Sequence, residues 1–566
     1  MAENSGEHGG MARALPVLLR LGAILAFVLL TNGGFLQRIL LLADQVRWGS
    51  LIGYLAVWAV AIAALLAVAF QARPWVRLFW AVLIALTAAV GLAYHKASGS
   101  ELSAFDVISL WNARHEAARA ADFYQRDLYW FALAFAGGLL VLAWPPRRRS
   151  RRWSLALAVA PLIPLLLIAG IVQLREGGGS QGLPSQFTPL AVATVAAKAL
   201  AGSSAPGRLE VAFAPGVPRA RKIVVLVDES VRGDYIDWTP GNPYTPELAA
   251  LAPRIVDFGP ASSGGNCSHY SNAILRFGAA RERMGQALLT NPTLWQYAKK
   301  AGYRTVYIDG QAGFNRNPGK LQNYMTEAET KSIDAFRPLP EDVAPPDLDD
   351  RVLDIVKEEL KGDGPVLIYA NKNGAHFPYD RGYPEAAAKF HPTMTETPQD
   401  SALSRIASFR NAVSWTVDRF FKRLFDEVDL TDTVVLYTSD HGQQFDPSRL
   451  THCTVEDPDP REGLVPLFVA AGDPALQQRF ADGAAASRQH ASHFALVPTA
   501  YELMGYRPDD IATLYPETLF AADRQEPAFT TGDIFGLFSP KVRWHPLDLG
   551  KSYLEPFDPA AAAKAP

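Results

Sequence analysis

Apolar residues are distributed unevenly along this chain, and five long apolar runs fall within residues 1–175. Most of these runs approach the roughly 20 residues that an α-helix needs to cross the hydrocarbon core of a bilayer. A cleavable signal peptide would contribute only one short run, so the pattern predicts an integral anchor of five transmembrane helices. The runs are Leu15–Leu30, Leu51–Phe70, Leu78–Tyr94, Leu128–Trp144 and Leu155–Val172.

Basic residues between the runs predict how this anchor is oriented. Cytoplasmic loops are enriched in Arg and Lys, so the N-terminus is expected in the cytoplasm and everything after the fifth run on the far side. We therefore expect a multi-pass membrane protein with an exported C-terminal domain. The five-helix plan favours the inner (cytoplasmic) membrane, with that domain in the periplasm. The basic residues lie before or within the first run, between the second and third, and between the fourth and fifth: Arg13, Arg20, Arg73, Arg77 and Arg147–Arg152.

The pattern changes after the anchor. A glycine-rich stretch at Glu176–Gly182 is typical of a flexible break and opens a predicted linker and lead-in over residues 176–221. Residues 222–554 are long enough to bury a large single core and form the predicted extracytoplasmic domain. Residues 555–566, rich in Ala and Pro, are predicted to be a flexible tail.

Strand-like and helix-like patterns alternate within residues 222–554. Such alternation predicts an α/β/α domain with a mostly parallel central sheet covered by helices on both faces. The short aliphatic runs that read as strands are Ile223–Val227, Arg304–Ile308, Val366–Ala370 and Val434–Tyr437. The segments with helical spacing are Thr293–Ala301, Leu348–Leu360 and Ser404–Val428.

Two of the predicted strands end abruptly in metal-binding side chains. Glu229 follows the first strand, and Asp440 and His441 follow the last. Open α/β sheets place their ligands at the carboxyl ends of their strands. A mixture of carboxylates and imidazole suits Zn²⁺ or Mn²⁺ better than Ca²⁺ or Mg²⁺. The alternative interpretation is two core strands that simply end in polar turns.

Three further parts of the sequence carry residues that a metal site at the sheet edge could use for catalysis. The Gly-led polar stretch Gly264–Ser271 is of the kind that opens a helix with exposed backbone amides and a nucleophile. His376 follows the third predicted strand, and His452 comes eleven residues after His441. The ordered set of carboxylate, nucleophile segment, His, Asp-His and His is much more specific than any one of its members.

This ordered set resembles the alkaline phosphatase/sulfatase superfamily, and within it the membrane-anchored phosphoethanolamine transferases of lipid A and their relative, lipoteichoic acid synthase. The first group also has five crossings before an extracytoplasmic α/β/α domain, so the resemblance covers nearly the whole chain. It implies that Glu229, next to Ser230, supplies one zinc ligand and that Ser439–Gly442 (Ser-Asp-His-Gly) supplies two. It also implies that His376 binds substrate or a second metal, and that His452 matches a later family His. Weaker echoes of family elements fall at Asn411, Asp418, His493 and Thr499.

The nucleophile position departs from the family pattern, which has Thr there. Spacing from the glycines puts Cys267 at this place, with Ser268 beside it. A zinc-bound thiolate is a competent nucleophile, which makes Cys267 a candidate for both nucleophile and metal ligand. Conversion of Cys267 to formylglycine, as in sulfatases, is not expected, because His269 and Ser271 replace the residues that this modification needs. Attack by Ser268 is the alternative.

The cysteine count opens a further alternative. The chain has 2 Cys, Cys267 and Cys453, and both lie beside candidate motifs in a domain predicted to be exported into an oxidising compartment. A structural disulfide between them is the competing interpretation. It would exclude Cys267 as the nucleophile.

Together with the resemblance, these residues predict a metal-dependent transferase. It would move a phospho-headgroup, phosphoethanolamine or phosphoglycerol, from a phospholipid donor to lipid A or another envelope lipid or glycan. Zinc held by the ligand set would activate Cys267 or Ser268, and His376 or His452 would deprotonate the acceptor. The competing interpretations are an exported phosphodiesterase or sulfatase and a non-catalytic lipid sensor. A formal net charge of −3 gives no indication of nucleic-acid binding.

Overall fold

The chain forms two compact units, Met1–Ser203 and Ser204–Pro566. The computed structural model describes residues 5–99, 101–112, 125–146, 156–202, 207–311, 329, 332–340, 342–397, 399–521, 525–538 and 542–557. The basic run at Arg147–Arg152 and most of the predicted tail, residues 558–566, lie outside these ranges.

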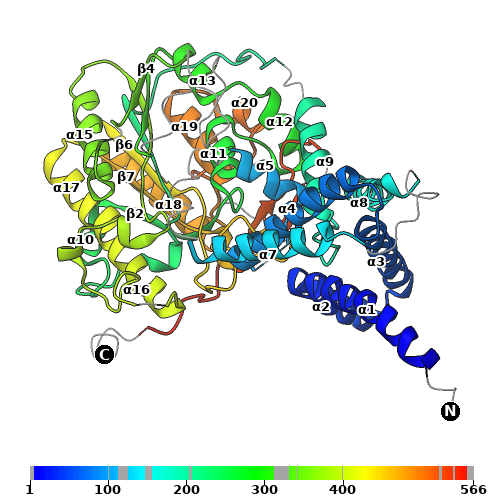
Figure 1. Cartoon of the computed structure of the whole chain (residues 1–566). Helices are drawn as coiled ribbons and strands as arrows, with labels where there is room; N and C mark the ends of the chain where they lie inside the picture. The colour runs from blue at the N-terminus through cyan, green and yellow to red at the C-terminus, as the bar shows by residue number, and fades with distance from the viewer. Residues whose placement is uncertain are drawn as a thin grey trace. The chain divides into compact units, whose positions relative to one another are not determined.

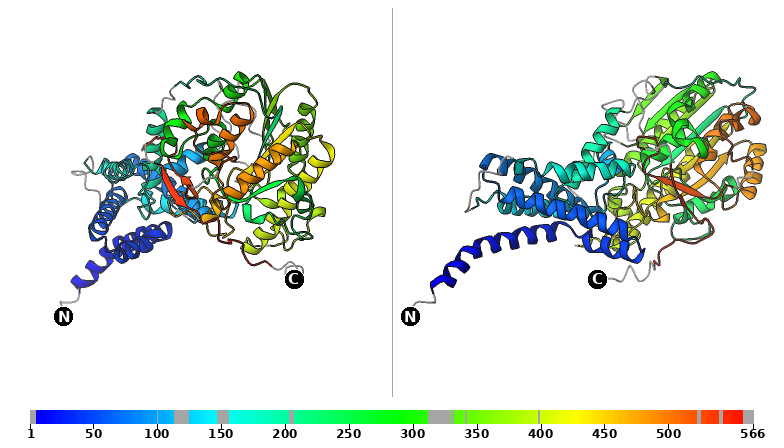
Figure 2. Two further views of the ribbon diagram at one scale, coloured as in Figure 1. Left: turned by 180° about the vertical axis from the view of Figure 1, so that it is seen from behind. Right: turned by 90° about the vertical axis from the view of Figure 1, so that its right-hand side faces the viewer.

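The first unit is helical (Figure 1), and the apolar runs lie on its helices. α4 and α7 pack along one another, and both contact α1 and α3 (Figure 2). The helices that carry the apolar runs are α1 (Ser5–Thr31), α3 (Trp48–Ala69), α4 (Pro74–Ser98), α7 (Gln125–Ala143) and α8 (Leu162–Leu174). The others described here are α2 (Gly34–Asp44), α5 (Ala104–Asn112) and α9 (Thr188–Gly202).

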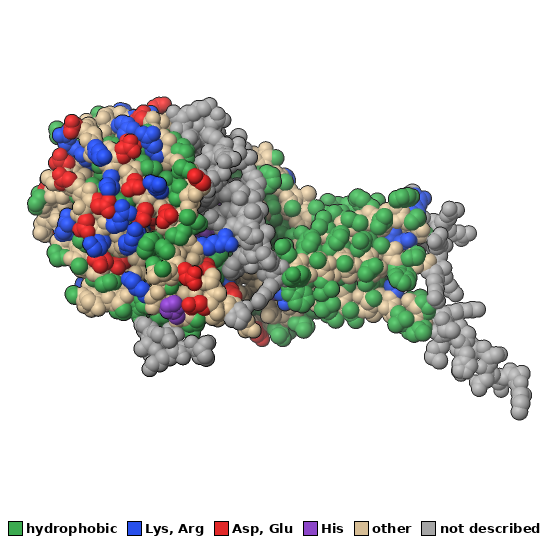
Figure 3. Space-filling view, turned by 60° about the vertical axis from the view of Figure 1, so that its left-hand side comes forward, with side chains coloured by type: hydrophobic (Ala, Val, Ile, Leu, Met, Phe, Trp, Pro, Cys, Tyr) green, Lys and Arg blue, Asp and Glu red, His purple; other side chains and the backbone are tan. Residues whose placement is uncertain are grey.

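Two of these helices, α3 and α4, are long and apolar enough to cross a membrane. A third candidate span is the pair formed by Leu15–Thr31 of α1 and by α2, which is bent by 69° at its break. The apolar parts of α7 and α8 are shorter. Figure 3 shows largely hydrophobic side chains over the visible face of this unit, as a lipid-facing surface requires. The structure thus shows an apolar helical unit with two or three candidate spans, and the number five stays a prediction.

The predicted linker begins inside this helical unit. The Gly182 carbonyl accepts hydrogen bonds from Tyr54 Oη at 2.6 Å and Trp58 Nε1 at 3.0 Å. Gln186 Nε2 donates to Thr31 Oγ1 at 2.6 Å, and α9 follows directly. The helical unit therefore extends to residue 203, because polar groups of the glycine-rich stretch and its continuation bind side chains of the helices.

The second unit is built on a seven-stranded sheet in the order β2-β7-β6-β1-β5-β3-β4. The pairs formed by β1, β3, β4, β5 and β6 among themselves are parallel, whereas β7 pairs antiparallel with both β6 and β2. The strands are β1 (Lys222–Asp228), β2 (Val256–Ser262), β3 (Arg304–Asp309), β4 (Ala335–Pro338), β5 (Val366–Asn371), β6 (Thr433–Ser439) and β7 (Leu464–Ala471). A separate two-stranded ribbon joins β8 (Ala528–Thr531) to β9 (Arg543–Pro546).

Side chains of β1 alternate between two hydrophobic cores, one on each face of the sheet. Ile223 and Val225 belong to the core beneath α13 (Leu294–Lys300), α18 (Pro474–Ala486) and α19 (Leu496–Leu503). Val224 and Leu226 belong to the core beneath α15 (Leu348–Leu360), α16 (Ala402–Val413) and α17 (Arg419–Glu427). This arrangement confirms the predicted α/β/α architecture and its mostly parallel sheet.

Three local features differ from the predicted pattern. Strands β2, β4 and β7 of the main sheet were not predicted. Pro260 and Pro466 interrupt β2 and β7, β2 also carries a bulge, and β4 has only 4 residues. The predicted helix Ser404–Val428 is divided by a π-helical turn at Ser414–Asp418. The predicted tail begins packed, since Glu555 Oε1 lies 2.7 Å from Arg232 Nη1.

Candidate metal centre

Glu229 reaches the carboxyl edge of the sheet directly after β1. Side chains alternate along a strand, and the neighbouring Asp228 binds Lys372 Nζ at 2.7 Å instead of joining the Glu229 site. Ser230 Oγ donates to Glu229 Oε1 at 2.7 Å, and Gln311 Nε2 donates to Oε2 at 3.0 Å. These bonds fix the orientation of a carboxylate that is only 1% exposed.

Asp440 lies at the same level of the sheet, after β6. The parallel register of β1 and β6 pairs Asp228 with Ser439, so that Glu229 and Asp440 follow neighbouring strands side by side. Asp440 Oδ1 accepts hydrogen bonds from the backbone N–H of Ser230 at 3.0 Å and of His441 at 2.8 Å. Its Oδ2 is buried and accepts no hydrogen bond from the described part of the chain. That oxygen is available to a cation.

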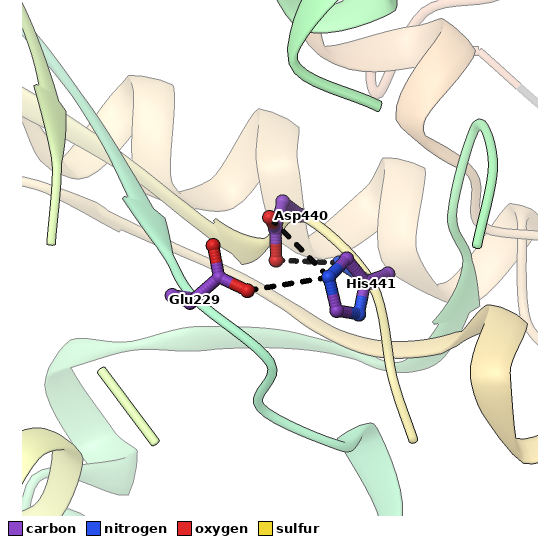
Figure 4. A group of neighbouring side chains, drawn as sticks. All are labelled: Glu229, Asp440 and His441. Carbon is purple, nitrogen blue, oxygen red and sulfur yellow. Dashed lines mark hydrogen bonds and ion pairs between the residues drawn. The ribbon is translucent and has the colours of Figure 1, made fainter. Parts of the chain in front are cut away.

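His441 presents Nε2 to both carboxylates. Its Nδ1 donates to the Gly442 carbonyl at 2.8 Å, which fixes the tautomer and leaves Nε2 to act as a ligand. Nε2 lies 3.2 Å from Glu229 Oε1 and 3.7 Å from Asp440 Oδ2. Figure 4 shows the three side chains converging on one point.

The charges of Glu229, Asp440 and His441 lie close together and shift one another's pKa values. Burial and the charge of Glu229 raise the pKa of Asp440 to about 8. Burial lowers the pKa of His441, but the carboxylates of Asp440 and Glu229 outweigh it and raise that pKa to about 9. Two buried carboxylates beside one imidazole favour an additional positive charge between them, which a divalent cation provides.

The donor set fits a metal ion. One ligand atom each from Glu229, Asp440 and His441 lies within 4.8 Å of the others, and all three residues are buried. Two carboxylates and one imidazole at this spacing match the ligands that zinc takes in proteins, and three protein ligands leave a fourth position for a reacting group. The structure thus brings together three of the four predicted metal ligands.

Ser268 lies beside this ligand set. It is the first residue of α11 (Ser268–Phe277), and its Oγ lies 3.2 Å from Glu229 Oε2 and 3.2 Å from His441 Nε2. Gly265 lets the loop before Ser268 pack closely against α11, since a Cβ on Gly265 would lie 2.8 Å from the Tyr270 Cβ. The hydroxyl of Ser268 is the nucleophilic group that the structure places beside the predicted metal ligands.

Cys267 is joined to Cys453 in a disulfide, with a Cα–Cα distance of 4.8 Å. This corrects the prediction that Cys267 is the nucleophile and a metal ligand, because a disulfide sulfur is neither a thiolate nucleophile nor a thiolate ligand. The sequence left the disulfide open as an alternative, and the structure selects it.

The two predicted histidines lie close to the centre. The His452 ring stacks on His441 with a centroid distance of 4.2 Å and an interplanar angle of 22°. Burial favours the neutral form of Glu229, but the hydrogen bond with His441 and the charge of that imidazole outweigh it and hold the pKa of Glu229 well below the usual range, with smaller contributions from His376 and His452. Both His376 and His452 are partly exposed, as groups that meet a substrate must be.

The weaker echoes of family elements have structural roles. Asn411 Oδ1 accepts from the backbone N–H of Lys389 at 2.7 Å, and Asp418 Oδ1 accepts from that of Leu248 at 2.7 Å. His493 Nδ1 accepts from the Gly264 N–H at 3.0 Å and supports the loop before Ser268. Thr499 Oγ1 accepts from the Leu519 N–H at 2.8 Å.

Gln311 is a site residue that the sequence reasoning missed. It holds Glu229 and follows β3, one of the predicted strands. The signal was present, because a polar residue after a parallel strand falls at the same sheet edge as the other candidates.

Comparison with known proteins matches residues 221–506 to the sulfatase family. A Kdo(2)-lipid A phosphoethanolamine 7''-transferase of Salmonella typhimurium is 31% identical over 137 residues, or 24% of this chain and 22% of that protein. Phosphoethanolamine transferase EptC of Escherichia coli is 26% identical over 242 residues, or 40% of each chain. The chain thus aligns with less than half the length of these relatives.

A solved structure shares the fold of nearly the whole chain. The integral membrane protein lipooligosaccharide phosphoethanolamine transferase A of Neisseria meningitidis superposes with a TM-score of 0.64 at 19% identity. The match covers 89% of this chain and 98% of that one, and therefore includes an N-terminal helical region as well as the α/β domain. With the family match spanning half of its length, the chain belongs to the sulfatase family.

Proposed function

We propose that this protein is a zinc-dependent transferase that moves phosphoethanolamine from a phospholipid to lipid A or another envelope lipid or glycan. The observation that carries the proposal is the position of Ser268 Oγ, 3.2 Å from both Glu229 Oε2 and His441 Nε2. A nucleophile beside a three-ligand site is the arrangement that covalent headgroup transfer needs. The phosphoethanolamine transferases among its relatives support the choice of headgroup.

The first half-reaction forms a covalent intermediate on Ser268. Zinc bound by Glu229, Asp440 and His441 would supply Lewis-acid activation of the serine hydroxyl and the phosphodiester. Ser268 passes its proton to a neutral imidazole, His376 or His452, Oγ attacks phosphorus, and the bond between phosphorus and the diacylglycerol oxygen breaks. The same imidazole returns that proton to the departing oxygen, and diacylglycerol leaves.

The second half-reaction returns the enzyme to its starting state. The acceptor hydroxyl gives its proton to the same imidazole, and its oxygen attacks phosphorus. The bond from phosphorus to Ser268 Oγ breaks, and the imidazole passes the proton to Oγ, which restores the serine hydroxyl. Splitting one transfer into two displacements lets donor and acceptor bind in turn.

The proposed location is the inner membrane, with the α/β domain in the periplasm. Apolar helices such as α3 and α4 would hold the enzyme beside lipid donors. Protease added to intact spheroplasts should digest an epitope at the C-terminus, whereas inverted membrane vesicles should protect it. Protection in spheroplasts would place the domain in the cytoplasm and contradict this location.

The proposed function is tested with detergent-purified, zinc-loaded protein. Fluorescent phosphatidylethanolamine and phosphatidylglycerol are supplied separately, with and without lipid A, and both diacylglycerol and labelled acceptor are measured. We expect release from phosphatidylethanolamine, transfer of the headgroup to lipid A, and loss of both in Glu229→Ala. Release from phosphatidylglycerol alone would identify a phosphoglycerol transferase. Release to water that lipid A does not redirect would identify a hydrolase, and zinc-loaded protein that releases nothing would favour a sensor.

A further inference from the structure

The Cys267–Cys453 disulfide joins the two segments that carry reacting groups. Cys267 immediately precedes Ser268, the first residue of α11, and Cys453 immediately follows His452. The bond connects positions 186 residues apart in the sequence. The disulfide therefore links Ser268, the proposed nucleophile, to His452, a proposed proton-transfer group, because each is the chain neighbour of one of the two cysteines.

Hydrogen bonds beside the disulfide hold the same two segments together. The Cys453 N–H donates to the Asn266 carbonyl at 2.9 Å, and Asn266 Nδ2 donates to the Thr454 carbonyl at 2.8 Å. The buried Glu462 carboxylate accepts from Asn266 Nδ2 at 2.7 Å and from the Thr454 N–H at 3.0 Å. The segments of Cys267 and Cys453 are thus joined by buried hydrogen bonds as well as by the disulfide.

The His452 segment belongs to an irregular stretch of the chain. Residues 440–459, between β6 and the turn that leads to β7, form no helix or strand. On the site side, the stacking of His452 on His441 sets its ring plane. Beside the hydrogen bonds, the disulfide is the covalent link between the segment of His452 and the start of α11.

We propose that the Cys267–Cys453 disulfide is a positioning element of the active site, and that its reduction switches catalysis off without releasing the metal. This inference rests on the proposed function, because it assigns the disulfide a part in the transfer step. Glu229, Asp440 and His441 follow strands β1 and β6 and form the ligand group without either cysteine, so we expect the metal site to survive reduction. Turnover depends on it, because Ser268 and His452 must face one phosphorus atom together.

A water-soluble phosphine is the reductant suited to the test. One phosphine and one water convert the disulfide to two thiols: the sulfur–sulfur bond breaks, each sulfur gains a proton, and the phosphine becomes a phosphine oxide. The chain contains no other cysteine, so every effect on protein sulfur is confined to this pair. Reaction of the freed thiols with a maleimide reports how much of the bond is reduced.

The experiment measures kcat, KM, zinc content and Tm of the full-length protein before and after reduction. We expect reduction to lower kcat for diacylglycerol release at least tenfold, at a temperature well below the reduced Tm, with KM changed less than threefold and zinc retained. The variant Cys267→Ser/Cys453→Ser should show the same low kcat and no response to phosphine. A purely structural disulfide would lower Tm and leave kcat unchanged at that temperature.

Three results would overturn the inference. Equal kcat in oxidised and reduced protein would show that the bond positions nothing that catalysis needs, and loss of zinc on reduction would show that the bond supports the metal site. A rise in kcat on reduction would identify a free Cys267 thiolate as the nucleophile. If the double variant does not fold, the reduction series on the native sequence still decides among these outcomes. Failure of the oxidised, zinc-loaded protein to release any headgroup would instead contradict the proposed function.

Discussion

The Ser268 hydroxyl lies 3.2 Å from His441 Nε2, within hydrogen-bond distance of a predicted metal ligand. We therefore expect Ser268→Ala to lower kcat for headgroup release by a factor of 10³ or more, since the covalent intermediate cannot form. Zinc content should remain at the native value, because Ser268 is not one of the three protein ligands. Release assays and metal analysis on the same preparation check both parts.

The matched control for this change is Ser448→Ala, which removes the same hydroxyl from an exposed residue. Its kcat should equal that of the native protein. If Ser268→Ala kept native activity, the nucleophile would have to be another group.

Loss of a metal ligand should act on both metal binding and stability. Glu229→Gln keeps the size of the side chain but removes a charge from the ligand set, so we expect zinc content to fall well below one per chain. A metal held at 100 times its dissociation constant stabilises the folded state by about 2.7 kcal/mol, and a chelator should therefore lower the native Tm. The Glu229→Gln variant should show little further loss with the chelator. Glu358→Gln, an exposed Glu on α15, serves as the control and should respond as the native protein does.

Asp309 is not one of the predicted metal ligands but lies next to the centre through Gln311, and it predicts a pH dependence of stability. Burial raises its pKa to about 7, although the Gln311 N–H favours the carboxylate. The folded chain keeps this proton up to about pH 7, whereas the unfolded chain releases it near pH ~4. Between these values the folded state binds more protons than the unfolded state, so this group lowers stability as the pH rises.

Asp309→Asn should remove the loss of stability that Asp309 causes as the pH rises. Asn stays neutral and keeps an oxygen that can accept the Gln311 N–H, now 3.0 Å from Asp309 Oδ1. We expect a gain on the order of 2–4 kcal/mol at pH 8 and almost none at pH 4. Tm measured across this range for native and variant protein checks the difference. The exposed Asp482→Asn should shift Tm equally at both pH values, and an equal shift for Asp309→Asn would contradict the assigned pKa.

The residues at the carboxyl ends of the central strands could be predicted from the sequence more easily than the outer strands of the sheet. Glu229, Asp440 and His441 could be placed because each follows an uninterrupted aliphatic strand, and parallel strands bring such residues together. Strands β2 and β7 could not be predicted, because Pro260 and Pro466 are unfavourable within a strand. They are strands because they pair with one another in the folded sheet. The choice between Cys267 and Ser268 depended on which way adjacent side chains point at the start of α11. A shift of one position along the chain exchanges those directions, and no spacing argument resolves it.

Behind Glu229, Lys372 is completely buried and binds Asp228 Oδ2 at 2.7 Å. Tyr437 Oη donates to the same oxygen at 2.8 Å. Removing one partner of a buried pair leaves the other charge uncompensated, which typically costs about 3–5 kcal/mol. We expect Lys372→Met to destabilise the protein by this amount and to disturb the end of β1 enough to weaken zinc binding at Glu229.

A control variant distinguishes the effect of losing the Lys372–Asp228 pair from the effect of replacing any lysine. Lys422→Met breaks a surface ion pair with Asp426 and should change Tm little, because solvent screens exposed ion pairs. The double variant Lys372→Met/Asp228→Asn removes both buried charges and should recover much of the stability that Lys372→Met loses. A double variant no more stable than Lys372→Met, measured by Tm under matched conditions, would show that Asp228 is not the group that needs Lys372. In that case the requirement would lie with the second carboxylate near Lys372 Nζ, that of Asp349 at 3.6 Å.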